Sequence, residues 1–217
     1  MALVLYGYWR SLASYRVRIA LNLKAVAYRE EMVDLSQGEQ FSPEYSSVNP
    51  QNVVPVLEHD GLRVSQSLAI LEYIDDIWAQ PSLLPADAAG KARVRSLAQI
   101  AIADVHPLIV PRVRDFLERE CGVDEANRLK WVRHWFDKGT QALEARLADG
   151  QAGLFCHGDQ ISLADLALAS HVAGARLFSC DLTRAPRLTG IIDRCMKLEA
   201  FARAHPLAQP GAPSTTA

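Results

Sequence analysis

Two serines stand where helices are predicted to begin, a position that offers chemistry as well as structure. Ser11 comes just before a helical apolar pattern over 13–23, and Ser67 follows Gln66 at the start of another over 66–78. The first turn of a helix carries unpartnered N–H groups and a partial positive charge. A serine there either caps the helix or helps those N–H groups to hold an anion. A thiolate at Ser11 and a carboxylate at Ser67 fit the second interpretation.

Other motifs that carry chemistry are missing from the sequence. It has no Gly-rich nucleotide signature, no nucleophile elbow of hydrolases and no HExxH zinc motif. The six histidines are scattered, and no CxxC spacing occurs among the four cysteines, Cys121, Cys156, Cys180 and Cys195. We therefore expect neither a metal centre nor a disulfide framework.

The composition is that of an ordinary globular protein. The 217 residues are 49% hydrophobic and 22% charged, and 23 Lys and Arg against 25 Asp and Glu give a net charge of -2. This balance predicts no nucleic-acid partner. No apolar run reaches the roughly 18 residues of a membrane helix, and the N-terminus lacks the features of a signal peptide. We expect a cytoplasmic protein without a membrane partner.

The elements that must position Ser11 and Ser67 are those of a small mixed sheet. Alternating apolar patterns predict strands at 3–6, 28–33, 53–57 and 62–64. With the two helices named above and a short one near Glu44, the predicted order is β-α-β-α-β-β-α. Residues 79–90 are rich in Pro, Ala and Gly and have no periodicity, so we place a linker at 81–90.

Beyond the linker the strand patterns disappear. Helical periodicity covers four segments, 91–120, 124–148, 163–178 and 188–204. The sequence therefore predicts an α/β domain over 1–80, followed by an all-helical domain over 91–217.

This order of elements resembles the cytosolic glutathione transferases, whose fold joins an N-terminal thioredoxin-like domain to an all-helical C-terminal domain. The run YWRSLASYRVRIAL, residues 8–21, is similar to the signature of the zeta class, the family of maleylacetoacetate and maleylpyruvate isomerases of aromatic amino acid catabolism. The likeness covers essentially the whole chain. It continues through shorter motifs: Gln40-Phe41, Asn49-Pro50, Val54-Pro55, Gln66-Ser67, Leu83-Leu84-Pro85, Ser162-Leu163-Ala164-Asp165 and Leu198-Glu199-Ala200-Phe201.

The resemblance implies glutathione as the cofactor. It gives Ser11 the role of activating the glutathione thiol, and it implies a cis bond at Val54-Pro55, with the Val54 main chain pairing with the bound peptide. It assigns seven residues to glutathione binding: Ser11, Gln40, Val54, Pro55, Gln66, Ser67 and His106. Gln40 would contact the glycine end, and Gln66 with Ser67 the γ-glutamyl carboxylate. For two of these residues a purely structural role is the alternative to glutathione binding. Ser67 would then be a helix cap, and His106 would be a structural residue before a Pro that is expected to kink its helix.

Arginines are the expected ligands of the second substrate, because a guanidinium binds carboxylates in a planar, bidentate manner. Arg10, beside Ser11, is a candidate for both catalysis and substrate binding, and Arg112 and Arg176 are further candidates. Many relatives have Arg directly before Phe, where this chain has Leu, so a surface ion pair is the alternative for Arg176. Arg16 and Arg18 are expected to face solvent or to form structural ion pairs.

The chain departs from the family pattern directly after Ser11. Leu12-Ala13 stands where relatives have Ser-Cys. Ala13 cannot form a mixed disulfide, so a reductive dehalogenation that relies on a protein thiol is not expected. Isomerisation is not prevented by this change, because there the sulfur belongs to glutathione.

Three functions remain open. The first is cis–trans isomerisation of maleylacetoacetate or maleylpyruvate by reversible addition of the glutathione thiolate. The second is conjugation of small electrophiles to glutathione by a transferase. The third is a non-catalytic binding protein on the same scaffold. The resemblance further implies a homodimer, with glutathione and a small dicarboxylate as the ligands.

Overall fold

The computed structural model describes residues 3–213, which form two compact units. The first unit contains 3–82 together with 197–213, and the second contains Leu83–Met196. These limits differ from the predicted domains, because 83–90 already belong to the second unit and the last part of the chain belongs to the first. The ends of the predicted domains, 1–2 and 214–217, lie outside the described residues.

The first unit is built on a four-stranded sheet of strand order β2-β1-β3-β4. β1 pairs with β2 in parallel and with β3 antiparallel, and β3 and β4 form an antiparallel hairpin. Leu5 and Leu57 lie opposite each other on β1 and β3 and are completely buried. The strands are β1 (Leu3–Gly7), β2 (Arg29–Met32), β3 (Val56–His59) and β4 (Leu62–Ser65).

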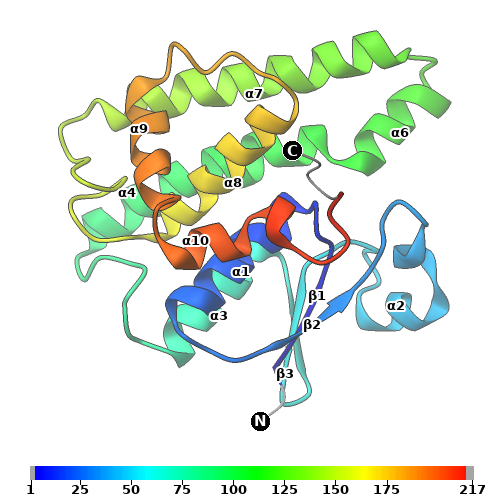
Figure 1. Cartoon of the computed structure of the whole chain (residues 1–217), viewed down its shortest axis with the longest axis horizontal. Helices are drawn as coiled ribbons and strands as arrows, with labels where there is room; N and C mark the ends of the chain where they lie inside the picture. Colours follow the sequence, from blue (N-terminus) through cyan, green and yellow to red (C-terminus); the bar gives the residue numbers. More distant parts are fainter. Residues whose placement is uncertain (1–2, 214–217) are drawn as a thin grey trace. The chain divides into compact units, whose positions relative to one another are not determined.

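Helices cover both faces of this sheet (Figure 1). α1 (Leu12–Leu23) and α3 (Ser67–Ile77) pack together on one face, and α2 (Pro43–Val48) lies on the other. The predicted β-α-β-α-β-β-α order is confirmed. α10 (Glu199–Ala204) packs against α1, where the side-chain amide of Asn22 donates to the carbonyl of Ala200 at 3.0 Å.

The second unit is helical throughout its regular elements, and none of the described helices is long and apolar enough to cross a membrane. The predicted helix 91–120 is interrupted twice. A π-helix (Ile100–Val105) separates α4 from α5, and the extended backbone of Val110 separates α5 from α6. The helices are α4 (Ala88–Gln99), α5 (His106–Ile109), α6 (Pro111–Arg119), α7 (Glu125–Leu147), α8 (Leu163–Leu177) and α9 (Pro186–Cys195).

A second predicted helix, 188–204, is also interrupted, and its two parts belong to different units. α9 ends at Cys195, and α10 begins at Glu199. The apolar period continues through this gap because both helices bury a face, α9 in the second unit and α10 in the first. Periodicity therefore predicted one helix where the chain has two.

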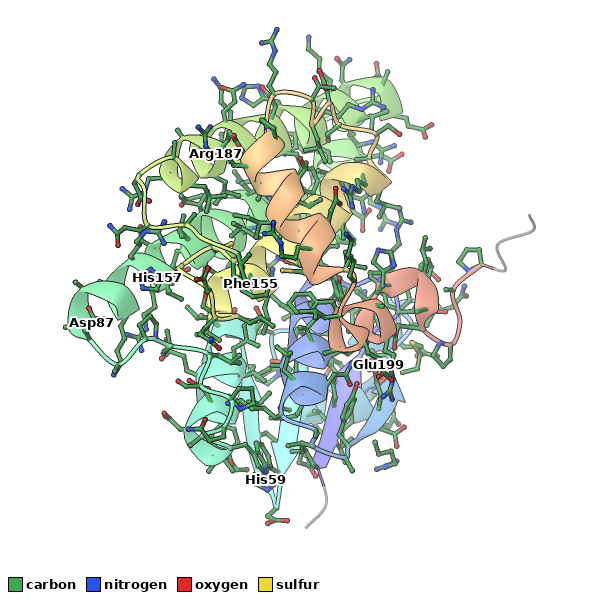
Figure 2. The ribbon with its side chains drawn as sticks, turned by 60° about the vertical axis from the view of Figure 1, so that its left-hand side comes forward. His59, Asp87, Phe155, His157, Arg187 and Glu199 are labelled. Carbon is green, nitrogen blue, oxygen red and sulfur yellow. The ribbon has the colours of Figure 1, made fainter. Side chains whose placement is uncertain are left out.

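The long connection between α7 and α8 is fixed by a buried arginine. The guanidinium of Arg93 donates to both carboxylate oxygens of Asp149, at 2.8 and 2.9 Å, and to the carbonyl of Cys156. This pairing lowers the pKa of Asp149 to about 2. His157 contacts the same guanidinium, and Figure 2 shows it on the side of the unit where Asp87 caps α4. The buried guanidinium thus holds two points of a connection that contains no helix or strand.

Candidate functional site

Ser11 lies at the N-cap of α1, as one interpretation of the sequence required. Its Oγ accepts a hydrogen bond from the N–H of Ser14 at 3.1 Å. Within 3–213, however, the Ser11 hydroxyl proton has no acceptor, and the N–H groups of Leu12 and Ala13 form no hydrogen bond. Capping therefore leaves three donors at the start of α1 for an anion.

A buried ion pair holds the loop that leads to Ser11. Arg18 is 1% exposed, and its guanidinium lies 2.7 Å from the Glu30 carboxylate. The same guanidinium donates to the carbonyls of Tyr8, at 2.9 Å, and Trp9, at 3.4 Å. The predicted structural ion pair of Arg18 is confirmed. Arg10 follows these two carbonyls directly and is exposed to solvent.

The segment before β3 presents free main-chain groups. The Val54-Pro55 peptide bond is cis, as predicted. The carbonyl of Val53 accepts hydrogen bonds from Tyr45 and Asn49, both at 2.7 Å. Among the residues that the structure describes, neither the N–H nor the C=O of Val54 has a hydrogen-bond partner. These two groups are able to pair with an extended peptide.

The start of α3 is not capped by Ser67, which was the structural alternative for that residue. Gln66 is the N-cap residue, with a φ of 68°, and its side chain bonds to Gln51 rather than to the helix. Ser67 is the first helical residue and does not cap, so that interpretation is wrong. Its Oγ instead accepts a hydrogen bond from Nε of Arg16 at 2.9 Å.

Arg16 is the residue that the sequence analysis missed. Its side chain is 2% exposed rather than solvent-facing, and burial lowers its pKa to about 9. A signal was present, because Ile19 and Ala20 follow at the spacing that shares a helix face, and both are completely buried. An Arg on the apolar face of α1 has to enter the interior of the unit.

Gln40 lies in a short 3-10 helix, Glu39–Phe41. Its Oε1 is shielded from solvent and accepts no hydrogen bond within the described chain. A buried acceptor without a donor costs about 1–3 kcal/mol. An N–H group of a bound peptide would remove that cost.

The register of the sheet brings most of these positions to one edge. Tyr6 on β1 pairs with Val56 on β3, and Val56 pairs with Ser65 on β4. The loop of Ser11 follows Tyr6 in the chain, and Val54 precedes Val56. Ser67 follows Ser65. Three segments that are distant in sequence therefore end beside one another. Together they offer donors and acceptors to a single ligand.

The remaining predicted residues belong to the second unit. His106 is the first residue of α5, directly after the π-helix. Arg112 is exposed on α6 and forms no ion pair within residues 3–213. Arg176, at the end of α8, pairs with Asp193 at 2.7 Å on the surface, as the alternative interpretation anticipated. No cluster of three His, Cys, Asp or Glu side chains in the described range is arranged to hold a metal.

Comparisons with known proteins agree with this arrangement. Residues 1–76 match the family model described as "Glutathione S-transferase, N-terminal domain". The chain is 44% identical to a probable maleylacetoacetate isomerase of Vibrio cholerae, covering 98% of this chain and 99% of that protein. It is 42% identical to a maleylpyruvate isomerase of a Ralstonia species, covering 95% and 98%.

A solved structure is similar over nearly the whole chain. It is the maleylacetoacetate isomerase of Methylobacterium extorquens AM1 with bound malonate and glutathione, 46% identical, with a TM-score of 0.95. The match covers 97% of this chain and all of that one. The predicted fold class, a thioredoxin-like domain followed by an all-helical one, is confirmed.

Proposed function

Because the chain belongs to the zeta class of the glutathione transferase family, we propose that it is a glutathione-dependent cis–trans isomerase of maleylacetoacetate or maleylpyruvate. When bound, glutathione supplies the thiolate that adds reversibly to the cis double bond, so that rotation precedes its departure from the trans product. The chain's own residues must hold this thiol in its ionised form and orient the two reactants.

The start of α1 carries the proposal. The Ser11 hydroxyl donates to the sulfur, assisted by the N–H groups of Leu12 and Ala13, and the positive end of the helix favours the negative charge. All three donors lack partners within 3–213. Because Ser14 donates to the oxygen of Ser11, the hydroxyl proton is left to point away from the helix.

The other unpartnered groups fit the rest of the tripeptide. The main chain of Val54 pairs with the cysteinyl backbone, and Oε1 of Gln40 receives an N–H near the glycine end. Ser67 and the uncapped N-terminus of α3 receive the γ-glutamyl carboxylate, with Gln66 beside them. The first unit is thus proposed as the glutathione-binding domain.

Arginine is the proposed ligand of the dicarboxylate. Arg10 is the first choice, since it adjoins Ser11 and is exposed without an ion-pair partner in the described chain. Arg112 is second. Arg176 is third, because Asp193 already neutralises its charge. Because Arg112 and Arg176 both belong to the second unit, we propose this unit as the substrate-binding domain. His106, also in that unit, stays a proposed contact to glutathione. We also propose a cytoplasmic homodimer, on the resemblance to the family.

Turnover of both maleyl compounds tests this function. The purified chain should convert at least one of them to its fumaryl isomer only when glutathione is present, with Ser11→Ala as a control of strongly reduced activity. Conjugation of chlorodinitrobenzene without turnover of either maleyl compound would favour a transferase instead. Failure to bind immobilised glutathione would favour the non-catalytic protein.

A further inference from the structure

We propose that Arg16 is a positioning residue for glutathione, which sets the affinity for the γ-glutamyl carboxylate through Ser67 without touching the ligand. This inference rests on the proposed function, because it assumes that glutathione is the anion held at the start of α3. It goes further in assigning a role to a residue outside the set that contacts the ligand.

The geometry separates Arg16 from any ligand. Arg16 is 2% exposed, so a group of the size of a water molecule reaches neither its guanidinium nor its aliphatic stem. Ser67, the first residue of α3, is 5% exposed. The contact between them is a hydrogen bond of 2.9 Å from Nε of Arg16 to Oγ of Ser67, between residues 51 positions apart on α1 and α3. Arg16 can therefore act on an incoming anion only through the groups it holds.

That hydrogen bond fixes how the Ser67 hydroxyl can be used. A serine hydroxyl has one proton and two lone pairs. Since one lone pair accepts from a cationic donor, the rotamer of Ser67 is held and its proton is left to be donated elsewhere. A hydroxyl that accepts a charge-assisted bond becomes a stronger donor in turn. A carboxylate at the start of α3 would receive this proton.

Charge acts in the same direction as the hydrogen bond. Gln66 provides no side-chain cap, so the first N–H groups of α3 keep their partial positive charge. A guanidinium inside the unit, next to the first residue of this helix, adds a full positive charge that solvent screens only weakly. Burial lowers the pKa of Arg16 to about 9, because the surroundings disfavour its charged form, but this value still leaves the guanidinium protonated at neutral pH. An apolar side chain of similar length would fill the same space but would offer Ser67 neither the charge nor the Nε–H donor.

Calorimetry with two ligands tests the role. The first ligand is glutathione, and the second is 4-aminobutyryl-cysteinyl-glycine, which lacks only the γ-glutamyl carboxylate. Arg16→Met should weaken glutathione binding at least tenfold and change binding of the second ligand less than twofold. Arg16→Lys, which keeps a charge but loses the Nε geometry, should show a smaller loss of at least threefold. Adding Arg16→Met to Ser67→Ala should cause a smaller loss than Arg16→Met causes in the wild type, because the part that acts through the Ser67 hydroxyl is already gone.

Arg29→Met is the matched control, because it removes one positive charge from a surface ion pair with Glu31 in the same unit. It should bind both ligands as the wild type does. If the wild type does not bind glutathione, the proposed function fails first. If the wild type binds and Arg16→Met weakens both ligands equally, or neither, the positioning role is overturned. If Arg16→Met does not fold, as thermal unfolding will show, Arg16→Lys decides by the same comparison.

Discussion

Arg18 and Glu30 lie 2.7 Å apart, and the same guanidinium holds the carbonyls of Tyr8 and Trp9. One buried charge therefore ties β2 to the loop that carries Arg10 and Ser11. The carbonyl of Tyr8 also accepts from the N–H of Ser11 at 3.0 Å. The position of the proposed catalytic serine thus depends on an ion pair outside the proposed ligand-binding set.

Glu30→Gln should lower the free energy of unfolding by about 2 kcal/mol, because it leaves Arg18 buried without a counter-charge. Chemical denaturation at pH 7 measures this. Glu31→Gln is the control, since its pair with Arg29 is on the surface, and it should cost less than about 0.5 kcal/mol. Equal losses in the two variants would contradict the structural role of the buried pair.

Ser11→Ala should raise the thiol pKa of bound glutathione and lower the isomerisation rate by about 10²-fold, if the hydroxyl contributes roughly 2–3 kcal/mol. Thiolate absorbance against pH and turnover, measured on both forms, check the two effects. The change also removes the acceptor for the N–H of Ser14, so a loss of stability of about 1 kcal/mol is expected. Full turnover with an unchanged thiol pKa would leave Ser11 as a helix cap alone.

Arg10→Met should lower kcat/KM for the maleyl substrate roughly 10- to 150-fold, the effect of losing a charge-assisted pair of about 1.5–3 kcal/mol. Conjugation of chlorodinitrobenzene, a neutral electrophile, should barely change. Arg112→Met should have a smaller effect, and Arg176→Met the smallest, because Asp193 pairs with that side chain. The arginine assignment is wrong if all three variants turn over both maleyl compounds normally.

Stability should fall between pH 6.5 and pH 4 because of His171 on α8. This histidine is 3% exposed, and burial lowers its pKa to about 4. The unfolded chain, with a pKa near 6.5 for this residue, binds a proton in that window while the folded chain does not. The folded state therefore loses about 3 kcal/mol as the pH falls through it. His171→Gln should flatten this slope, and an identical slope in both proteins would refute the assignment.

The order of the first seven elements followed from the sequence because each apolar pattern is short and ends at a turn signal. The helices of the second unit were harder to divide. The π-helix 100–105 and the turn at Val110 keep apolar residues such as Ala101, Val105 and Ile109 buried, so the pattern shows no break. Only the backbone reveals where such a helix changes.

Candidate site residues that lie at element boundaries could be located from the sequence, and those defined by tertiary contacts could not. Ser11 follows a strand and precedes a helix, and the sequence patterns of both elements show this boundary. The contact between Arg16 and Ser67 joins α1 to α3, and no pattern in the sequence around either residue indicates it. The same holds for Arg176, whose partner Asp193 lies on a different helix.

The return of 197–213 to the first unit sets an order of events during synthesis. Asn22 on α1 finds its partner Ala200 only after the second unit has been translated, and the ring of His205 that packs on Tyr15 comes later still. At common elongation rates the intervening Leu83–Met196 takes roughly 6 to 23 seconds to be synthesised. During that time the nascent N-terminal unit exposes the surface of α1 that α10 later covers. The unit that is made first is thus the last to be completed.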